Sequence, residues 1–134
     1  MIQSDIKKIV EDLVETFLDA GKISLNLRRK GLTKEIKSDN TPVSNGDLEV
    51  NKILTKKILD LTPNILIVSE EASENKTRNN LENFWLIDPI DGTYDYINDL
   101  DEFTINAGLI IQKKPVAGLI YAPAKNRMFY SYGD

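Results

Sequence analysis

The sequence predicts an α+β fold in which two long helices pack on a largely antiparallel sheet. Apolar residues recur at helical spacing in two segments within residues 4–61, and five short apolar segments bounded by turn residues follow them. Helices that precede a run of strands are typical of this layered class. Because 134 residues are enough to bury a core, we expect one folded unit over residues 1–134.

The first helix is predicted over residues 4–29. Its apolar positions repeat every three or four residues from Ile6 through Phe17, which places them on one face. Ser4 precedes this pattern as a capping candidate, and Gly31 ends it. We therefore expect a long amphipathic helix with one face turned toward the core.

A second helix is predicted to begin near Ser44 and to end at Leu61. Ser44 and Asp47 fit a capping box, and Pro63 lies just beyond the last apolar position. The polar segment 34–45 between the two helices carries turn signals, so it is expected to form an exposed loop or a short hairpin.

The remaining apolar segments predict a sheet. The run over residues 65–69 is continuously apolar, which favours a strand buried on both faces, and residues 84–87 form a second short buried strand. The polar stretch 70–83 between them is expected to be a loop with a little helix. Three consecutive antiparallel strands are then predicted over residues 104–111, 116–121 and 128–132.

Composition excludes several kinds of chemistry. The chain has no cysteine and no histidine, so it cannot use a zinc thiolate site, a cysteine nucleophile or a Ser-His-Asp triad. Its net charge of −4 argues against binding a nucleic-acid backbone. Carboxylates without histidine or cysteine favour a hard cation such as Mg²⁺ or Ca²⁺.

The start of the chain does not resemble a targeting signal. Residues 1–8 lead into the amphipathic pattern and lack the basic and apolar regions of a signal peptide. The longest apolar runs, at residues 65–68 and 116–122, are too short to cross a bilayer. We expect no membrane span and a cytoplasmic location.

Acidic residues follow the two predicted buried strands and form the main candidate site. Glu70 follows the first of these strands, and Asp88 and Asp91 follow the second. Carboxylates at neighbouring strand ends repel one another unless a cation neutralises them. Pro89 is expected to fix a turn and lacks an N–H group, so the adjacent carbonyl of Ile90 can serve as a further oxygen ligand.

Backbone N–H groups next to these acids predict an anion site. Gly92 and Thr93 stand where a helix could begin, and a phosphate there would bridge the cation and the helix terminus. Taken singly, the residues also fit structural roles. Asp47 suits helix capping, Glu71 suits a solvated surface, and Asp91 followed by Gly92 is a common turn.

One long string connects these residues with a known family. Residues 85–93 read Trp-Leu-Ile-Asp-Pro-Ile-Asp-Gly-Thr, with Ser-Glu-Glu at residues 69–71 and Pro-Val-Ser at residues 42–44 leading into Asp47. Together they resemble the inositol-monophosphatase-like superfamily of Mg²⁺-dependent, lithium-sensitive phosphatases. The resemblance implies a layered α/β sugar-phosphatase-like fold, of which this chain is expected to be the N-terminal lobe.

Two later segments look most like one branch of that superfamily. Residues 102–106 and 116–123 are similar to the 3'(2'),5'-bisphosphate nucleotidases. This branch removes the 3'-phosphate of adenosine 3',5'-bisphosphate, a product left by sulfate assimilation, by means of a metal-activated water. Two alternatives stay open: an inositol- or sugar-phosphate phosphatase, and a truncated, non-catalytic lobe that only binds metal or phosphate.

The resemblance also implies a metal-ligand set. Glu70, Asp88 and the carbonyl of Ile90 match the ligands of one Mg²⁺, and Asp88 would bridge to a second Mg²⁺ that Asp91 also binds. Two or more divalent ions of this kind can stabilise both the attacking and the leaving oxygen of an in-line phosphoryl displacement. A small phosphate ester is the expected substrate.

Catalytic and substrate-binding roles are implied in the same way. Asp47, Glu70 and Thr93 match the residues that orient or deprotonate the nucleophile. Lys37 either assists a metal-bound water or is a solvated lysine. The residues that match the phosphate-binding set are Glu70, Asp91, Gly92 and Thr93.

The sequence departs from the family pattern in three places. Asn45-Gly46 replaces a small residue and alanine before Asp47, and Tyr94 and Tyr96 stand in a segment that usually carries a basic or amide residue and then phenylalanine. The Trp-Asp-x-Ala-Ala type of segment that completes the second metal site does not occur. We therefore expect the C-terminal lobe to be absent and a homo-oligomer or a complementing C-terminal fragment to be a partner.

Overall fold

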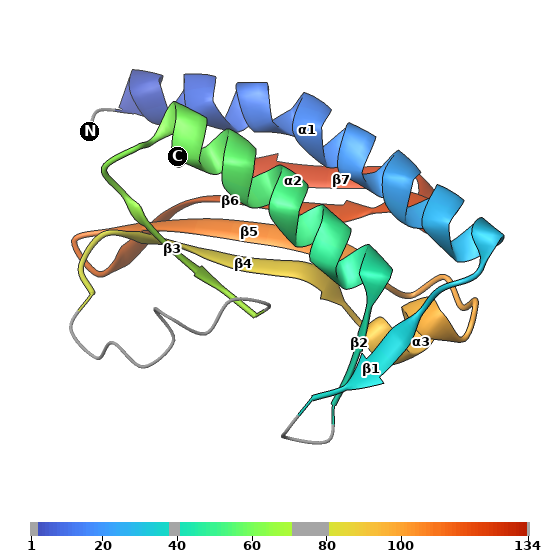
Figure 1. Ribbon diagram of the computed structural model, residues 1–134. Helices are drawn as coiled ribbons and strands as arrows, with labels where there is room; N and C mark the ends of the chain where they lie inside the picture. Colours follow the sequence, from blue (N-terminus) through green and yellow to red (C-terminus); the bar gives the residue numbers. More distant parts are fainter. Residues whose placement is uncertain (1–2, 38–40, 71–80, 134) are drawn as a thin grey trace.

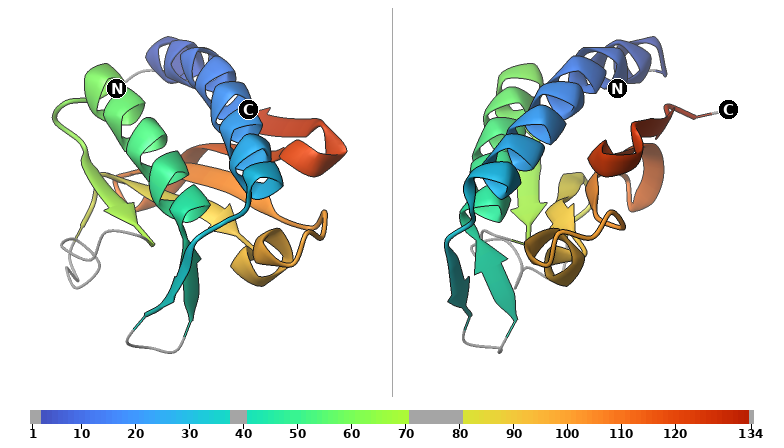
Figure 2. Two further views of the ribbon diagram at one scale, coloured as in Figure 1. Left: turned by 45° about the vertical axis from the view of Figure 1, so that its right-hand side comes forward. Right: turned by 90° about the vertical axis from the view of Figure 1, so that its right-hand side faces the viewer.

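Two layers make up the computed structural model, which describes residues 3–37, 41–70 and 81–133. One layer holds the two long helices, α1 (Gln3–Lys30) and α2 (Asn45–Leu61), which lie side by side. The other is a five-stranded sheet, and the helices cover one of its faces (Figures 1 and 2). The α+β class predicted from the sequence is confirmed.

The sheet has the strand order β3-β4-β5-β6-β7. The first pair, β3 (Leu66–Ser69) and β4 (Phe84–Asp91), is parallel, and every later pair is antiparallel. The later strands are β5 (Thr104–Ile111), β6 (Lys114–Ala122) and β7 (Arg127–Ser131). The expectation of a largely antiparallel sheet is therefore correct.

A short hairpin, a short helix and a 3₁₀ turn complete the described fold. The segment between the long helices forms a hairpin of β1 (Lys34–Ile36) and β2 (Pro42–Ser44), one of the two forms expected for it. The five-residue helix α3 (Thr93–Ile97) follows β4, and the 3₁₀ turn η1 (Pro123–Lys125) joins β6 to β7. Of the loop predicted over residues 70–83, residues 71–80 lie outside the described residues.

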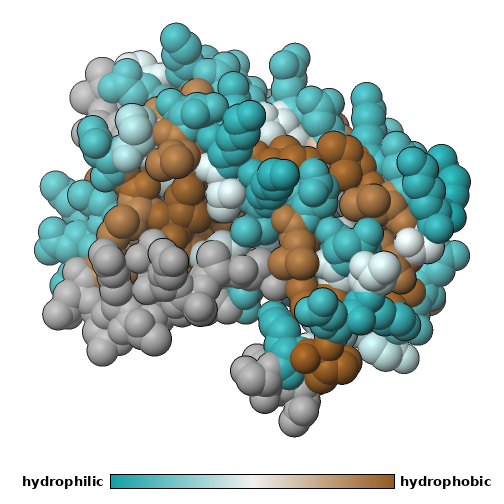
Figure 3. Space-filling view, viewed as in Figure 1, coloured by the Kyte–Doolittle hydropathy of each residue, from teal (hydrophilic) through white to brown (hydrophobic). Residues whose placement is uncertain are grey.

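One apolar core lies between the helices and the sheet. Hydrophilic side chains dominate the outer side of the helical layer, along the top of the space-filling view (Figure 3). The inner faces supply fully buried side chains, each of which stabilises the fold by about 1.5–3 kcal/mol. The central ones are Val10, Leu13, Phe17, Val50, Leu54, Ile58, Trp85, Ile87, Leu109 and Leu119.

The strand at residues 65–69 was predicted to be buried on both faces and the strand at residues 84–87 to be buried, but each has one exposed face. Leu66 of β3 is 37% exposed and Leu86 of β4 is 54% exposed, whereas Trp85 and Ile87 face the core. The prediction is wrong because it took continuous apolar character as burial. β3 is an edge strand, and the side of the sheet away from the helices is apolar without a helix on it in the described part of the chain.

The turn predicted after Asp88 is also absent, since β4 continues through Asp91. The register with β5 shifts between Asp88 and Asp91, where the pairing moves from Asn106 to Thr104. Pro89 sits inside this irregularity. Because proline cannot donate to a strand ladder, it is tolerated where the ladder is broken.

Candidate functional site

One cavity of about 330 Å³ collects nearly all of the predicted site residues. It lies where β3 and β4 end, next to the β1–β2 hairpin and α3. The lining residues are Lys37, Thr41, Pro42, Glu70, Asp88, Ile90, Asp91, Gly92, Thr93 and Tyr94. Segments that are far apart in the sequence therefore bring the acidic, carbonyl and hydroxyl groups into one place.

Parallel pairing of β3 and β4 places Glu70 beside Asp88. Ser69 pairs with Ile87, so the next residue of each strand lies at the same end of the sheet. The Glu70 amide continues the ladder by donating to the Ile87 carbonyl at 3.1 Å. The two acidic residues that follow the apolar runs are therefore neighbours on adjacent strands.

Asp47 does not line the cavity but reaches it through Thr93. The Thr93 hydroxyl donates to Asp47 Oδ1 at 2.8 Å and lies 3.2 Å from the Ile90 carbonyl oxygen. Since a hydroxyl has a single proton, its Oγ1 keeps lone pairs that can accept a further hydrogen bond. Thr93 therefore connects a buried carboxylate with a residue of the cavity wall.

The capping role of Asp47 is confirmed. Its Oδ2 accepts from the Ser44 amide at 2.9 Å and from the Ser44 hydroxyl at 2.5 Å, and the Asp47 amide donates to Ser44 Oγ at 3.2 Å. This is a complete capping box at the start of α2. One oxygen of the carboxylate thus holds the helix start, while the other holds Thr93.

Gly92 fixes the position of Thr93 by a backbone conformation that suits glycine. Its φ of 87° lies in the left-handed region, and a Cβ there would lie 3.1 Å from the Glu102 carbonyl oxygen. Because α3 has only five residues, its dipole is small. Any anion binding at Gly92 and Thr93 would depend on direct contact with their N–H groups.

Tyr96, on the same short helix as Thr93, packs α3 against the two long helices. The sequence did not indicate this role. Tyr96 is fully buried, and its hydroxyl donates to the Ser24 carbonyl of α1 at 2.7 Å. A Cβ on Gly46 would lie 2.2 Å from the Tyr96 hydroxyl oxygen, so α2 and α3 approach closely at this point. Burial raises the pKa of Tyr96 well above its ordinary value, and the nearby Asp47 carboxylate raises it further.

The donor set fits a hard divalent cation. Carboxylates and a backbone carbonyl are the ligands that Mg²⁺ and Ca²⁺ prefer, and the cavity wall offers both. Within residues 3–37, 41–70 and 81–133, no three acidic side chains lie close enough together to hold a metal ion as they stand. Glu70 and Asp91 are exposed.

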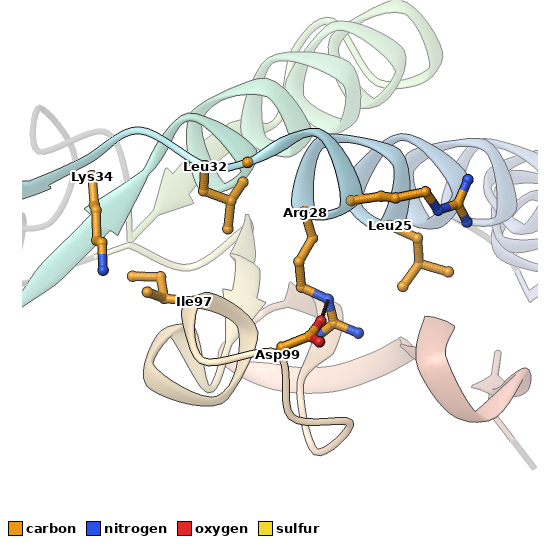
Figure 4. A pocket seen from close by; sticks show the side chains of 8 residues that line it. Leu25, Arg28, Leu32, Lys34, Ile97 and Asp99 are labelled. Atoms are coloured by element: carbon orange, nitrogen blue, oxygen red, sulfur yellow. Dashed lines mark ion pairs between the residues drawn. The ribbon is translucent and has the colours of Figure 1, made fainter.

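A larger cavity, of about 540 Å³, is lined by the end of α1, the start of β1 and the end of α3 with the loop after it, and none of the predicted site residues lines it. Figure 4 shows Arg28 in it, pointing at Asp99 with Nε 3.2 Å from the carboxylate. Arg28 Nη1 also donates to the Leu100 carbonyl at 2.6 Å. This cavity therefore marks where the end of α1 holds the loop after α3.

The sequence left two roles open for Lys37 and suggested a solvated surface position for Glu71. Lys37 lines the cavity, so its placement suits either of its two expected roles, and its participation in catalysis stays a prediction. Glu71 lies outside the described residues.

Among the described helices, none combines the length and the apolar character needed to cross a bilayer.

Comparison with known proteins identifies a family. The sequence profile of the inositol monophosphatase family matches residues 5–133. Two curated relatives named 3'(2'),5'-bisphosphate nucleotidase CysQ are similar. The protein of Haemophilus influenzae is 38% identical over 117 residues, covering 86% of this chain and 44% of the relative. The protein of Buchnera aphidicola is 33% identical over 131 residues, covering 96% and 49%.

Solved structures show the same fold. An IMPase of Thermotoga maritima superposes with a TM-score of 0.80 at 22% identity, covering 92% of this chain and 47% of that one. An IMPase/NADP phosphatase complexed with Mg²⁺ and phosphate gives 0.82 at 17% identity, covering 95% and 48%. The chain spans about half the length of the relatives it matches.

Proposed function

Since the chain belongs to the inositol monophosphatase family, we propose that it provides the metal- and phosphate-binding lobe of a Mg²⁺-dependent phosphomonoesterase. The observation that supports this most directly is the single cavity that gathers Glu70, Asp88, Asp91 and Thr93. Those residue types suit hydrolysis without histidine or cysteine, neither of which the chain contains.

Two Mg²⁺ sites follow from this proposal. Glu70, Asp88 and the Ile90 carbonyl would hold one ion, and Asp88 and Asp91 would hold the other. When bound, these ions would stabilise charge on the attacking and leaving oxygens of the phosphate ester. Their charge would also offset the repulsion between carboxylates drawn together at the strand ends.

The chain's own groups would orient the nucleophile and the phosphate. Thr93 Oγ1 donates a hydrogen bond to Asp47. The lone pairs of Oγ1 could therefore accept a hydrogen bond from the attacking water. Glu70 would accept a proton from that water, since a carboxylate is the available base. The N–H groups of Gly92 and Thr93 would hold the phosphate oxygens.

We infer that the substrate is a nucleoside 3',5'-bisphosphate such as adenosine 3',5'-bisphosphate. The curated relatives at 33–38% identity are named for that activity, which supports this class. Inositol or sugar phosphates are the alternative, because solved proteins of the same fold are inositol monophosphatases. A lobe that binds metal or phosphate without turnover is a further alternative, because the chain spans about half of its relatives. A cytoplasmic location and the oligomeric state stay predictions.

Phosphate release tests these proposals. Pure chain is incubated with adenosine 3',5'-bisphosphate or inositol 1-phosphate, with and without Mg²⁺, and Mg²⁺ binding is measured separately by calorimetry. We expect Mg²⁺-dependent release from the nucleotide, abolished in Asp88→Asn and retained in Asp60→Asn, a control at an exposed position near the end of α2. Preference for the inositol ester would contradict the substrate assignment. Mg²⁺ binding without turnover would identify a non-catalytic lobe.

A further inference from the structure

Tyr94 stands at the candidate site and contributes no side-chain bond to the fold. It lines the 330 Å³ cavity together with Gly92 and Thr93, and it is 69% exposed. Within the described part of the chain, its side chain forms no hydrogen bond or ring contact and does not pack against the core. Single exposed aromatic residues are ordinary on a protein surface, so what matters is where this ring lies.

The contrast with Tyr96 shows that the two sides of α3 have different tasks. Residues two positions apart lie on nearly opposite sides of a helix. Tyr96 is fully buried and bonded to the Ser24 carbonyl, which anchors α3 to α1. Tyr94 therefore points away from the core, on the side of α3 that is open to a ligand.

The backbone that carries Tyr94 is well fixed. Its carbonyl accepts from the Asn98 amide at 3.0 Å and from Asn98 Nδ2 at 2.8 Å. The Tyr96 ring on the same helix packs against Phe103, with 4.9 Å between the ring centroids. Because the backbone is already ordered, little of its freedom is lost when a ligand packs against the Tyr94 ring.

Tyr94 directly follows the two residues proposed to hold the phosphate. Since Gly92 and Thr93 would offer their N–H groups to phosphate oxygens, the next side chain of α3 is placed to meet the alcohol part of the ester. Among the described residues that line the cavity, Tyr94 has the one aromatic side chain. It is also a position at which this chain departs from the family pattern.

The alcohol parts considered for this site differ in a way that an aromatic ring distinguishes. A nucleobase is planar and stacks on aromatic side chains through its π-face, whichever base it is. Inositol is a puckered polyol without such a face. An exposed tyrosine beside the phosphate position therefore favours an ester with a planar aromatic part.

We propose that Tyr94 stacks on the base of the substrate and thereby makes the site select nucleotides over inositol or sugar phosphates. The inference rests on the proposed function, because it takes the phosphate to lie at Gly92 and Thr93. It adds a residue that recognises the alcohol part of the ester, whereas the groups assigned above act on the metal, the phosphate or the nucleophile.

Two ligands that differ in the base alone test the proposal. They are adenosine 3',5'-bisphosphate and its abasic analogue, in which hydrogen replaces the base. Each is titrated into the 134-residue chain by calorimetry, with Ca²⁺ in place of Mg²⁺ to limit hydrolysis, since both ions prefer oxygen ligands. We expect the unaltered chain to bind the nucleotide roughly tenfold more tightly than the abasic analogue.

Variants of Tyr94 separate stacking from other roles. Tyr94→Ala should weaken nucleotide binding roughly tenfold and leave binding of the abasic analogue unchanged. Tyr94→Phe keeps the ring and should bind both ligands as the unaltered chain does, whereas Tyr94→Leu keeps apolar bulk without a π-face and should resemble Tyr94→Ala. Because Tyr94 is exposed, these variants should keep the unfolding midpoint of the unaltered chain.

Tyr130→Ala is the matched control. Tyr130 on β7 is 52% exposed and does not line the 330 Å³ cavity, so its loss should change the affinity for neither ligand.

The possible results distinguish this inference from the proposed function. Equal affinity of the unaltered chain for both ligands, or equal losses for both in Tyr94→Ala, would overturn the role of Tyr94 and leave the phosphate site in place. Full nucleotide affinity in Tyr94→Leu would overturn stacking in favour of simple apolar burial. A chain that binds neither ligand would overturn the proposed phosphate site and this inference with it.

Discussion

The contact between Gly46 and Tyr96 relates two departures from the family pattern. The Tyr96 hydroxyl occupies the space that a Cβ at position 46 would need, since the two atoms would be 2.2 Å apart. We expect Gly46→Ala to lower the free energy of unfolding by about 1–3 kcal/mol through overpacking. Alanine's better helix propensity, worth up to about 1 kcal/mol, offsets only part of this. Urea denaturation measures the change.

Tyr96→Phe tests the steric explanation. Phenylalanine lacks the hydroxyl and its bond to Ser24, so its ring can move away from an alanine at position 46. Gly46→Ala should then cost less in the Tyr96→Phe background, with a coupling energy above about 0.5 kcal/mol. Tyr94→Phe, on the exposed side of the same short helix, should show no coupling. Additive effects of Gly46→Ala and Tyr96→Phe would contradict the explanation.

The same tyrosine makes stability depend on alkaline pH. Burial raises the pKa of Tyr96 well above its ordinary value of 10.0, the Asp47 carboxylate adds to this, and Arg28 acts in the opposite direction. The unfolded chain loses this proton near pH 10 while the folded chain keeps it, so the free energy of unfolding falls as pH rises above about 10. Between about pH 9 and pH 11 the unaltered protein should lose more stability than Tyr96→Phe. Equal losses in the two proteins would show that the pKa of Tyr96 is the same in the folded and unfolded chain, and would contradict this explanation.

At the scale of elements, periodicity predicted the helices and most strands, but it did not predict which faces of the strands are buried. The capping box at Ser44 and Asp47 located the start of α2 because its signal is local. Burial of β3 and β4 was overestimated because the face of the sheet that points away from the helices is apolar. The bulge around Pro89 was read as a turn, since strand register depends on a partner that a single segment does not reveal.

Arg28 fixes the loop after α3 to the end of α1. Its bond to the Leu100 carbonyl and its position 5.0 Å from the Phe103 ring centroid contribute more than its pair with Asp99, whose side chain is 86% exposed. Arg28→Lys removes the planar fork, so we expect a loss of about 1–2 kcal/mol. Hydrogen exchange of the Leu100 amide should quicken.

Arg29→Lys provides the matched control for that substitution. Arg29 is adjacent, exposed, and bonded to Asn26 of its own helix. Its replacement should leave both the unfolding midpoint and exchange in the α3 loop unchanged. Equal effects of Arg28→Lys and Arg29→Lys would indicate a general charge effect at the end of α1 in place of a specific contact with the loop.

At the scale of the whole molecule, the sequence singled out residues that the structure gathers around one cavity, but not the contacts that bring them together. Asp47 and Thr93 were singled out by motif, and their side chains meet across 46 positions of sequence. The sequence did not indicate the role of Tyr96, because its contacts with Gly46 and Ser24 join it to two separate helices. Such long-range approaches depend on how helices pack on the sheet, which a pattern within one segment does not encode.

The shared core predicts that helices and sheet unfold together. Trp85, the one tryptophan of the chain, is fully buried, and its Nε1 donates to Thr62 Oγ1 at 3.0 Å. Thr62 caps α2 and donates to the Ile58 carbonyl at 2.8 Å, so this indole reports on both layers. Urea transitions followed by tryptophan fluorescence and by far-ultraviolet circular dichroism should therefore coincide.

Thr62→Val tests whether the two transitions shift together. It leaves the buried indole N–H of Trp85 without its acceptor and should lower the free energy of unfolding by about 1–3 kcal/mol, shifting both transitions equally. Thr62→Ser keeps the hydroxyl and should cost less. A fluorescence transition that precedes the circular dichroism transition would mean that the sheet unfolds before the helices, because the two layers would then not share one cooperative core.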